Sequence, residues 1–101
     1  MESERRLKLE QEWKHLTEQA LPAAARTAGW PITEDHCFQR VLLDNACGGV
    51  WYDHVAARPA YRHASDDILL SAVTLGRAAL DGRANIDRLN RMSLKWRGKR
   101  G

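Results

Sequence analysis

Cysteine and proline are scarce in this chain of 101 residues, which contains two of the former and three of the latter. Cys37 and Cys47 are ten positions apart, a spacing that matches no common zinc or redox motif. Two thiols without a disulfide framework are typical of a reducing compartment. No apolar run approaches the roughly 18 residues needed to cross a bilayer, and the charged N-terminus leads into no apolar signal segment. We therefore expect a cytoplasmic protein with no membrane partner.

The sequence also lacks the patterns of a β-sheet. No segment alternates between apolar and polar residues, and Asp81-Gly82 joins two helix-like runs rather than two strands. Hydrophobic residues make up 44% and charged residues 29%, so a single globular domain over residues 1–97 can bury a core, with 98–101 as a basic tail. We predict an all-α fold, a compact bundle of four main helices with an irregular aromatic segment at about 48–64.

The first helix is expected before Gly29, a residue type that commonly ends helices. Its buried face should consist of apolar side chains at helical spacing, namely Leu9, Trp13, Leu16 and Ala20. Pro22 predicts a kink, or a restart of the helix with the proline in its first turn.

The second helix is expected at residues 34–46, with Thr33 as its N-cap. Arg40 and Asp44 are four positions apart, so we expect them to form an ion pair on the helix surface. The buried side chains of this helix should be Phe38, Val41 and Leu42.

Two more helices should follow the irregular segment. Ser65 is a good N-cap for the third helix, and the small residue Gly76 within it would let another helix approach closely. Asn85 predicts an N-cap for the last helix. The buried stripe of that helix should be Leu89, Met92 and Trp96.

Positive charge is concentrated at the C-terminal end. Residues 1–82 hold nine Lys and Arg against twelve Asp and Glu, whereas residues 83–101 hold seven against one. Such asymmetry indicates an anionic partner, and a basic helix after a short connection follows the order of a helix-turn-helix motif. The candidate nucleic-acid-binding residues are Arg88, Arg91, Lys95, Arg97, Lys99 and Arg100.

Histidine, cysteine and aromatic residues gather in the middle of the sequence. Asp53-His54 and Arg62-His63 lie beside tyrosines, and a His oriented by a carboxylate can act as a base toward a Cys nucleophile. The chain has no nucleophile elbow, HExxH motif or phosphate loop, so enzyme activity stays an open alternative. The candidate ligand-pocket residues are His36, Cys37, Arg40, Trp51, His54, Tyr61, Arg62 and His63.

The same histidines and cysteines give little support for a metal centre. His36 and Cys37 are sequence neighbours and would point about 100° apart on a helix. The spacings typical of zinc ligands are missing from the chain. We expect no metal and no cofactor.

Three runs of the sequence carry a family resemblance: WPITEDHCFQRVLLDN at residues 30–45, WYDH at 51–54 and RPAYR at 58–62. They resemble a family of short uncharacterised bacterial proteins, some of which are labelled GCN5-related acetyltransferases. That acetyltransferase fold would imply a mixed sheet-and-helix domain and an Arg/Gln-x-x-Gly-x-Gly/Ala loop for coenzyme A. The chain has no such loop and its pattern is helical, so the resemblance supplies no catalytic residue.

Three functions therefore remain as hypotheses. The first is a small non-enzymatic binding or regulatory module whose basic C-terminal helix binds an anionic partner, with nucleic acid as the leading choice. The second is a small enzyme or ligand-binding protein with a His/Cys/Arg/Trp pocket. The third is a helical adaptor that contacts another protein or forms a homodimer.

Overall fold

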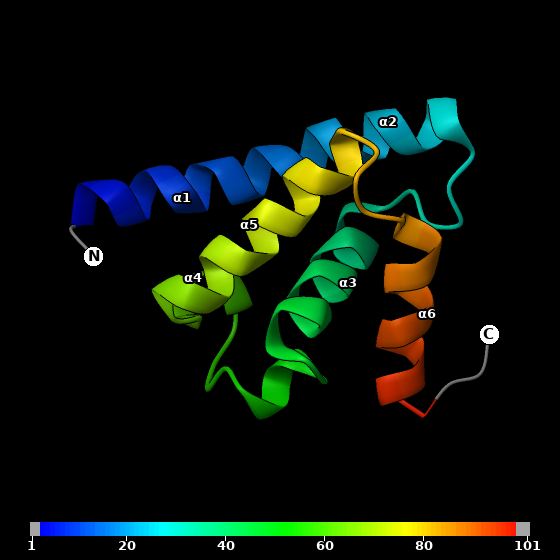
Figure 1. Ribbon diagram of the computed structural model, residues 1–101. Helices are drawn as coiled ribbons and strands as arrows, with labels where there is room; N and C mark the ends of the chain where they lie inside the picture. The colour runs from blue at the N-terminus through cyan, green and yellow to red at the C-terminus, as the bar shows by residue number, and fades with distance from the viewer. Residues whose placement is uncertain (1–2, 99–101) are drawn as a thin grey trace.

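The computed structural model describes residues 3–98 as a bundle of helices without a strand (Figure 1). A long N-terminal segment joins α1 (Ser3–His15), the π-helical stretch η1 (Leu16–Ala20) and α2 (Leu21–Ala28). The other main helices are α3 (Asp35–Cys47), α5 (Asp66–Leu80) and α6 (Ile86–Trp96). Two short helical turns, η2 (Trp51–Asp53) and α4 (Ala60–His63), lie between α3 and α5. The predicted all-α bundle of four main helices with an irregular aromatic segment is confirmed.

The N-terminal segment passes Pro22 without a break. The proline lies in the first turn of α2, directly after the π-helical stretch, where the Leu21 N–H bonds to the Leu16 carbonyl oxygen five residues back. One π-helical stretch precedes it, and there the Thr17 hydroxyl donates to the Trp13 carbonyl oxygen at 3.0 Å. Gly29 ends the helix with φ at 68°, a left-handed conformation that suits glycine. The predicted position of Pro22 in the first turn of a helix is confirmed, but the chain stays helical from α1 through η1 into α2 instead of stopping and starting again.

Helix α3 begins one residue later than predicted. Glu34 is the N-cap, with an extended backbone and no capping hydrogen bond from its side chain, so the expectation of Thr33 was wrong. The Asp35 side chain instead accepts a hydrogen bond from the His36 backbone N–H at 2.7 Å. An acidic group in the first turn also interacts favourably with the helix dipole. The helix therefore begins with an acidic first turn, as predicted, but one position further along the chain.

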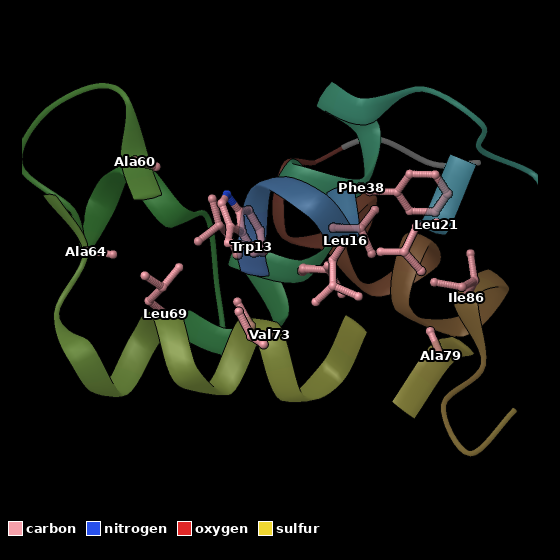
Figure 2. Close-up of a cluster of buried hydrophobic side chains, with 14 of the residues drawn as sticks. Trp13, Leu16, Leu21, Phe38, Ala60, Ala64, Leu69, Val73, Ala79 and Ile86 are labelled. Atoms are coloured by element: carbon pink, nitrogen blue, oxygen red, sulfur yellow. The ribbon is translucent and has the colours of Figure 1, made fainter. Parts of the chain in front are cut away.

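The core lies where α3 crosses α5 and the π-helical stretch. Figure 2 shows Trp13, Leu16 and Phe38 between α5 and the helices above it. Gly76 of α5 is buried here, and a Cβ atom at this position would lie 3.3 Å from Cδ1 of both Leu16 and Leu42. The predicted close approach at Gly76 is confirmed, and α3 is held in place for the site described below.

Helix α6 packs on α3, and this contact decides which of its side chains are buried. Ile86 and Ser93 are buried, whereas the predicted stripe of Leu89, Met92 and Trp96 is only half-buried. The predicted stripe was therefore wrong in part, because α6 turns a polar residue toward α3. The predicted N-cap Asn85 is confirmed by its hydrogen bond from the Arg88 N–H at 3.1 Å.

The arrangement of α5 and α6 differs from that of a helix-turn-helix motif. In that motif the two helices pack directly on each other, whereas here the main contact of α6 is with α3 (Figure 1).

None of the helices within residues 3–98 has the length and apolar character required to span a bilayer.

Candidate ligand-binding pocket

A buried carboxylate joins α3 to the end of α6. Asp44 has no solvent-exposed surface, and its two oxygens accept hydrogen bonds from Arg97 Nε at 2.7 Å and Arg97 Nη2 at 3.1 Å. The Ser93 hydroxyl donates to it at 2.6 Å and the Trp51 backbone N–H at 3.0 Å. These bonds offset the cost of burying the charge. They also fix Trp51 and Arg97 beside the same end of α3.

Arg40 does not pair directly with Asp44, so the predicted surface ion pair was wrong. Its Nη1 donates to the Ser93 hydroxyl oxygen and its Nη2 to Asn90 Oδ1, both at 2.8 Å. Ser93 therefore accepts from Arg40 and donates to Asp44, as one hydroxyl group can. Spacing of four residues placed the two charges on one face of α3, but α6 covers that face and separates them. The Arg40 guanidinium is thereby held by two neutral acceptors.

Arg40 and Arg97 line a pocket of about 640 Å³, which we call the α3–α6 pocket because it lies between α3 and the residue that follows α6. Helix α3 supplies His36, Gln39 and Arg40, which recur at i, i+3 and i+4 on one face. The buried side chains Trp13 and Leu43 provide apolar surface beneath them. A volume of this size lies within the range usual for small-molecule sites.

Aromatic and cationic side chains form a row on one side of the pocket, three of them from the irregular segment and the fourth from the end of α6. The Arg58 guanidinium carbon lies 5.0 Å from the Trp51 ring centroid, and that of Arg97 lies 5.4 Å from the Tyr52 ring centroid. The Trp51 and Tyr52 rings meet edge to face, with centroids 5.6 Å apart and planes at 81°. Cation–π and edge-to-face contacts of this kind stabilise the arrangement. We call Arg58, Trp51, Tyr52 and Arg97 the stacking row.

The charge of the pocket is positive. Among residues 3–98, its lining includes three arginines and a histidine but neither Asp nor Glu. The hydrogen bond that Arg97 donates to Asp44 raises the pKa of Arg97, against the opposing effect of burial. Asp44 also offsets the charge of Arg97, whereas Arg40 is bound by neutral oxygens and Arg58 stacks on a neutral ring. Within residues 3–98, Arg40 and Arg58 thus form no direct ion pair, and Asp44 is linked to Arg40 only through the Ser93 hydroxyl group.

The structure brings half of the predicted pocket residues together. His36, Arg40, Trp51 and Tyr61 all line the α3–α6 pocket. The remaining four do not line it: Cys37 is half-buried against the core, and three are exposed elsewhere, namely His54, Arg62 and His63.

Sequence reasoning missed Gln39, Tyr52, Arg58 and Arg97 as pocket residues. Gln39 could have been found from its position on the face of α3 that carries His36 and Arg40. Arg97 had been assigned to the basic stripe of the last helix, but it turns inward to Asp44. Its place depends on a partner 53 positions away, which no local pattern reveals.

The basic stripe of α6 lies on the opposite side of that helix from its buried residues. Arg88, Arg91 and Lys95 are exposed there, and Arg91 approaches Asp87 at 3.6 Å. Two further members of the predicted stripe, Lys99 and Arg100, lie outside the described residues. The stripe is therefore a separate surface from the α3–α6 pocket.

Within residues 3–98, no three His, Cys, Asp or Glu side chains are close enough to hold a metal ion together.

Comparisons of the chain with protein-family models, curated proteins and solved structures found no match. The family resemblance carried by residues 30–62 therefore stays a prediction, and the functional argument rests on the pocket itself.

Proposed function

We propose that this protein binds a phosphate-bearing ligand in the α3–α6 pocket. The observation that carries the proposal is the state of Arg40, whose guanidinium is held on the pocket wall by Ser93 and Asn90, both neutral. A guanidinium that is oriented by neutral acceptors and has no direct ion pair is prepared for an anion, because little side-chain ordering remains to be done on binding.

The charge balance favours a dianion. Arg40 and Arg58 supply the two guanidinium charges that no carboxylate of the lining offsets. A phosphate group carries nearly two negative charges at neutral pH, and its oxygens accept paired hydrogen bonds from guanidinium groups. A monocarboxylate would leave one of the two charges unbalanced.

The test is calorimetric titration with inorganic pyrophosphate at low salt. We expect Arg40→Gln to weaken binding about tenfold or more, because a charge-assisted hydrogen bond contributes roughly 1.5–3 kcal/mol. Arg58→Gln should also weaken binding, and because Arg58 is exposed this variant keeps the fold intact. Circular dichroism of each variant checks folding.

Arg88→Gln is the matched control, because it removes the same charge from the outer face of α6. It should bind pyrophosphate as the wild type does. Absence of binding by the wild type, or equal losses in Arg88→Gln and Arg58→Gln, would contradict the proposal.

Nucleic-acid binding by the outer face of α6 is a second candidate. It is favoured by the exposed Arg88 and Lys95, which project from the side of α6 opposite to α3. In this case the affinity for duplex DNA should fall with salt, with a slope of about −0.9 for each phosphate contacted. The double variant of Arg88→Gln with Lys95→Gln should reduce that slope by about two while pyrophosphate binding is retained. Unchanged DNA binding in the double variant would remove this candidate.

A further inference from the structure

The stacking row gives the pocket a second kind of recognition surface. Its four members follow one another as cation, ring, ring and cation, and all of them line the pocket that contains Arg40. Tyr52 is 53% exposed although its ring is held in contact with Trp51 and Arg97. The pocket therefore presents a fixed and solvent-accessible aromatic surface beside an anion-binding group.

We propose that the ligand is a nucleotide unit, whose base stacks on the stacking row while its phosphate contacts Arg40 and Arg58. This inference rests on the proposed function of phosphate binding. Bases that are not stacked in a duplex bind to aromatic rings and to the planes of guanidinium groups, and such binding tolerates every base. Arg97 is held at Tyr52 by its bonds to Asp44, so the row is ordered before the ligand binds.

Gln39 gives the pocket a group that suits the edge of a base. Its side-chain amide offers both a donor and an acceptor, the combination that pairs with the polar edge of a nucleobase. Its hydrogen bond to the Thr17 hydroxyl is long, at 3.5 Å, and therefore costs little to replace.

The experiment compares adenosine 5′-monophosphate with ribose 5-phosphate by calorimetry. The two ligands share the phosphate and the sugar, and they differ only in the base. We expect the nucleotide to bind about 5- to 150-fold more tightly, the range expected for stacking of one base. Tyr52→Ala should remove most of this difference, whereas Tyr52→Phe should keep it because the ring remains.

Equal affinity for the two ligands in the wild type would overturn the inference and leave phosphate binding standing. If neither ligand binds and pyrophosphate also fails to bind, the proposed function itself is overturned. A retained difference in Tyr52→Ala would also contradict the role of the stacking row.

A ten-nucleotide single strand and the matching duplex identify the source of the nucleotide. A single strand that binds more tightly than the mononucleotide points to single-stranded nucleic acid, and the reverse order points to a free nucleotide. Both results support the inference. The comparison uses the double variant of Arg88→Gln with Lys95→Gln, which lacks the charges of the outer face of α6. A duplex that binds this variant as tightly as the single strand does would overturn the inference, because the faces of paired bases are covered by their neighbours.

Discussion

Asp44 and Arg97 are joined by two hydrogen bonds, of 2.7 and 3.1 Å, although 53 positions separate them in the sequence. This pair holds Arg97, the residue that follows α6, against α3. Asp44 also accepts a hydrogen bond from the Trp51 backbone N–H, so one carboxylate positions the aromatic and cationic sides of the pocket together.

Loss of the Asp44 charge should destabilise the fold. Asp44→Asn weakens the bonds to Arg97 and leaves a half-buried guanidinium without its counter-charge. We expect a decrease of about 2–3 kcal/mol in the free energy of unfolding, measured by urea denaturation at pH 7. Asp53→Asn, at an exposed position nearby, is the control and should change stability by less than about 0.5 kcal/mol. Equal stability of the two variants would show that the buried pair contributes nothing.

The pH dependence of stability should include Asp66. The hydrogen bond from Arg6, at 2.6 Å, is the main cause that lowers the pKa of Asp66 below its ordinary value. A folded-state pKa below the unfolded one gives stability that is present above about pH 4 and is lost as the pH falls toward the folded pKa.

Asp66→Asn tests this contribution through urea denaturation at pH 7 and at pH 3. The variant should lose less stability on acidification than the wild type does. Asp67→Asn is the matched control, since Asp67 is the next residue in the first turn of α5 and is exposed. If Asp66→Asn and the wild type respond equally to acid, the interaction with Arg6 does not contribute to acid sensitivity.

Packing at Gly76 should not tolerate a larger side chain. The Leu16 and Leu42 methyl groups would lie 3.3 Å from a Cβ atom there, closer than ordinary van der Waals contact. We expect Gly76→Val to lower the free energy of unfolding by about 1–3 kcal/mol through overpacking. Ser71→Val, on the exposed side of the same helix, should have an effect below about 0.5 kcal/mol. Thermal unfolding midpoints of the two variants would reveal the difference, and coincident midpoints would contradict it.

Cys47 should react slowly with thiol reagents. Burial raises the pKa of its thiol, and the charge of Asp44 acts in the same direction. In a Cys37→Ser variant, the rate of alkylation should therefore rise with pH through a midpoint above about 8.5, the ordinary value for cysteine. A midpoint at or below that value would contradict the assigned surroundings of Cys47.

The helices were predictable because their ends are marked locally. Ser65 and Asn85 cap α5 and α6 through their own side chains, and Gly29 adopts the positive φ that ends α2. The buried side of α6 was not predictable from periodicity alone. The spacing of its apolar residues indicated one buried face. In the structure the buried face instead includes Ser93, whose hydroxyl donates a hydrogen bond to the buried carboxylate of Asp44.

The site was predictable in part: Trp51 and Tyr61 of the irregular aromatic segment were expected to line it and do so, as do two residues on one face of α3. His36 and Arg40 were recognised, and Gln39 lies on the same face of α3. Arg58 and Arg97 come from distant parts of the chain, and their approach depends on the tertiary contacts of Trp51 and Asp44. Local sequence patterns carry no information on such contacts.

The central claim, that the α3–α6 pocket binds the phosphate, is tested most directly by nuclear magnetic resonance. Pyrophosphate is titrated into ¹⁵N-labelled protein, and the amide and arginine Nε–H signals are followed. The account predicts saturable shifts at Arg40, Arg58 and their neighbours in 36–43 and 51–61, with little change on the outer face of α6. Shifts confined to residues 87–95, or no saturable shift at all, would contradict it.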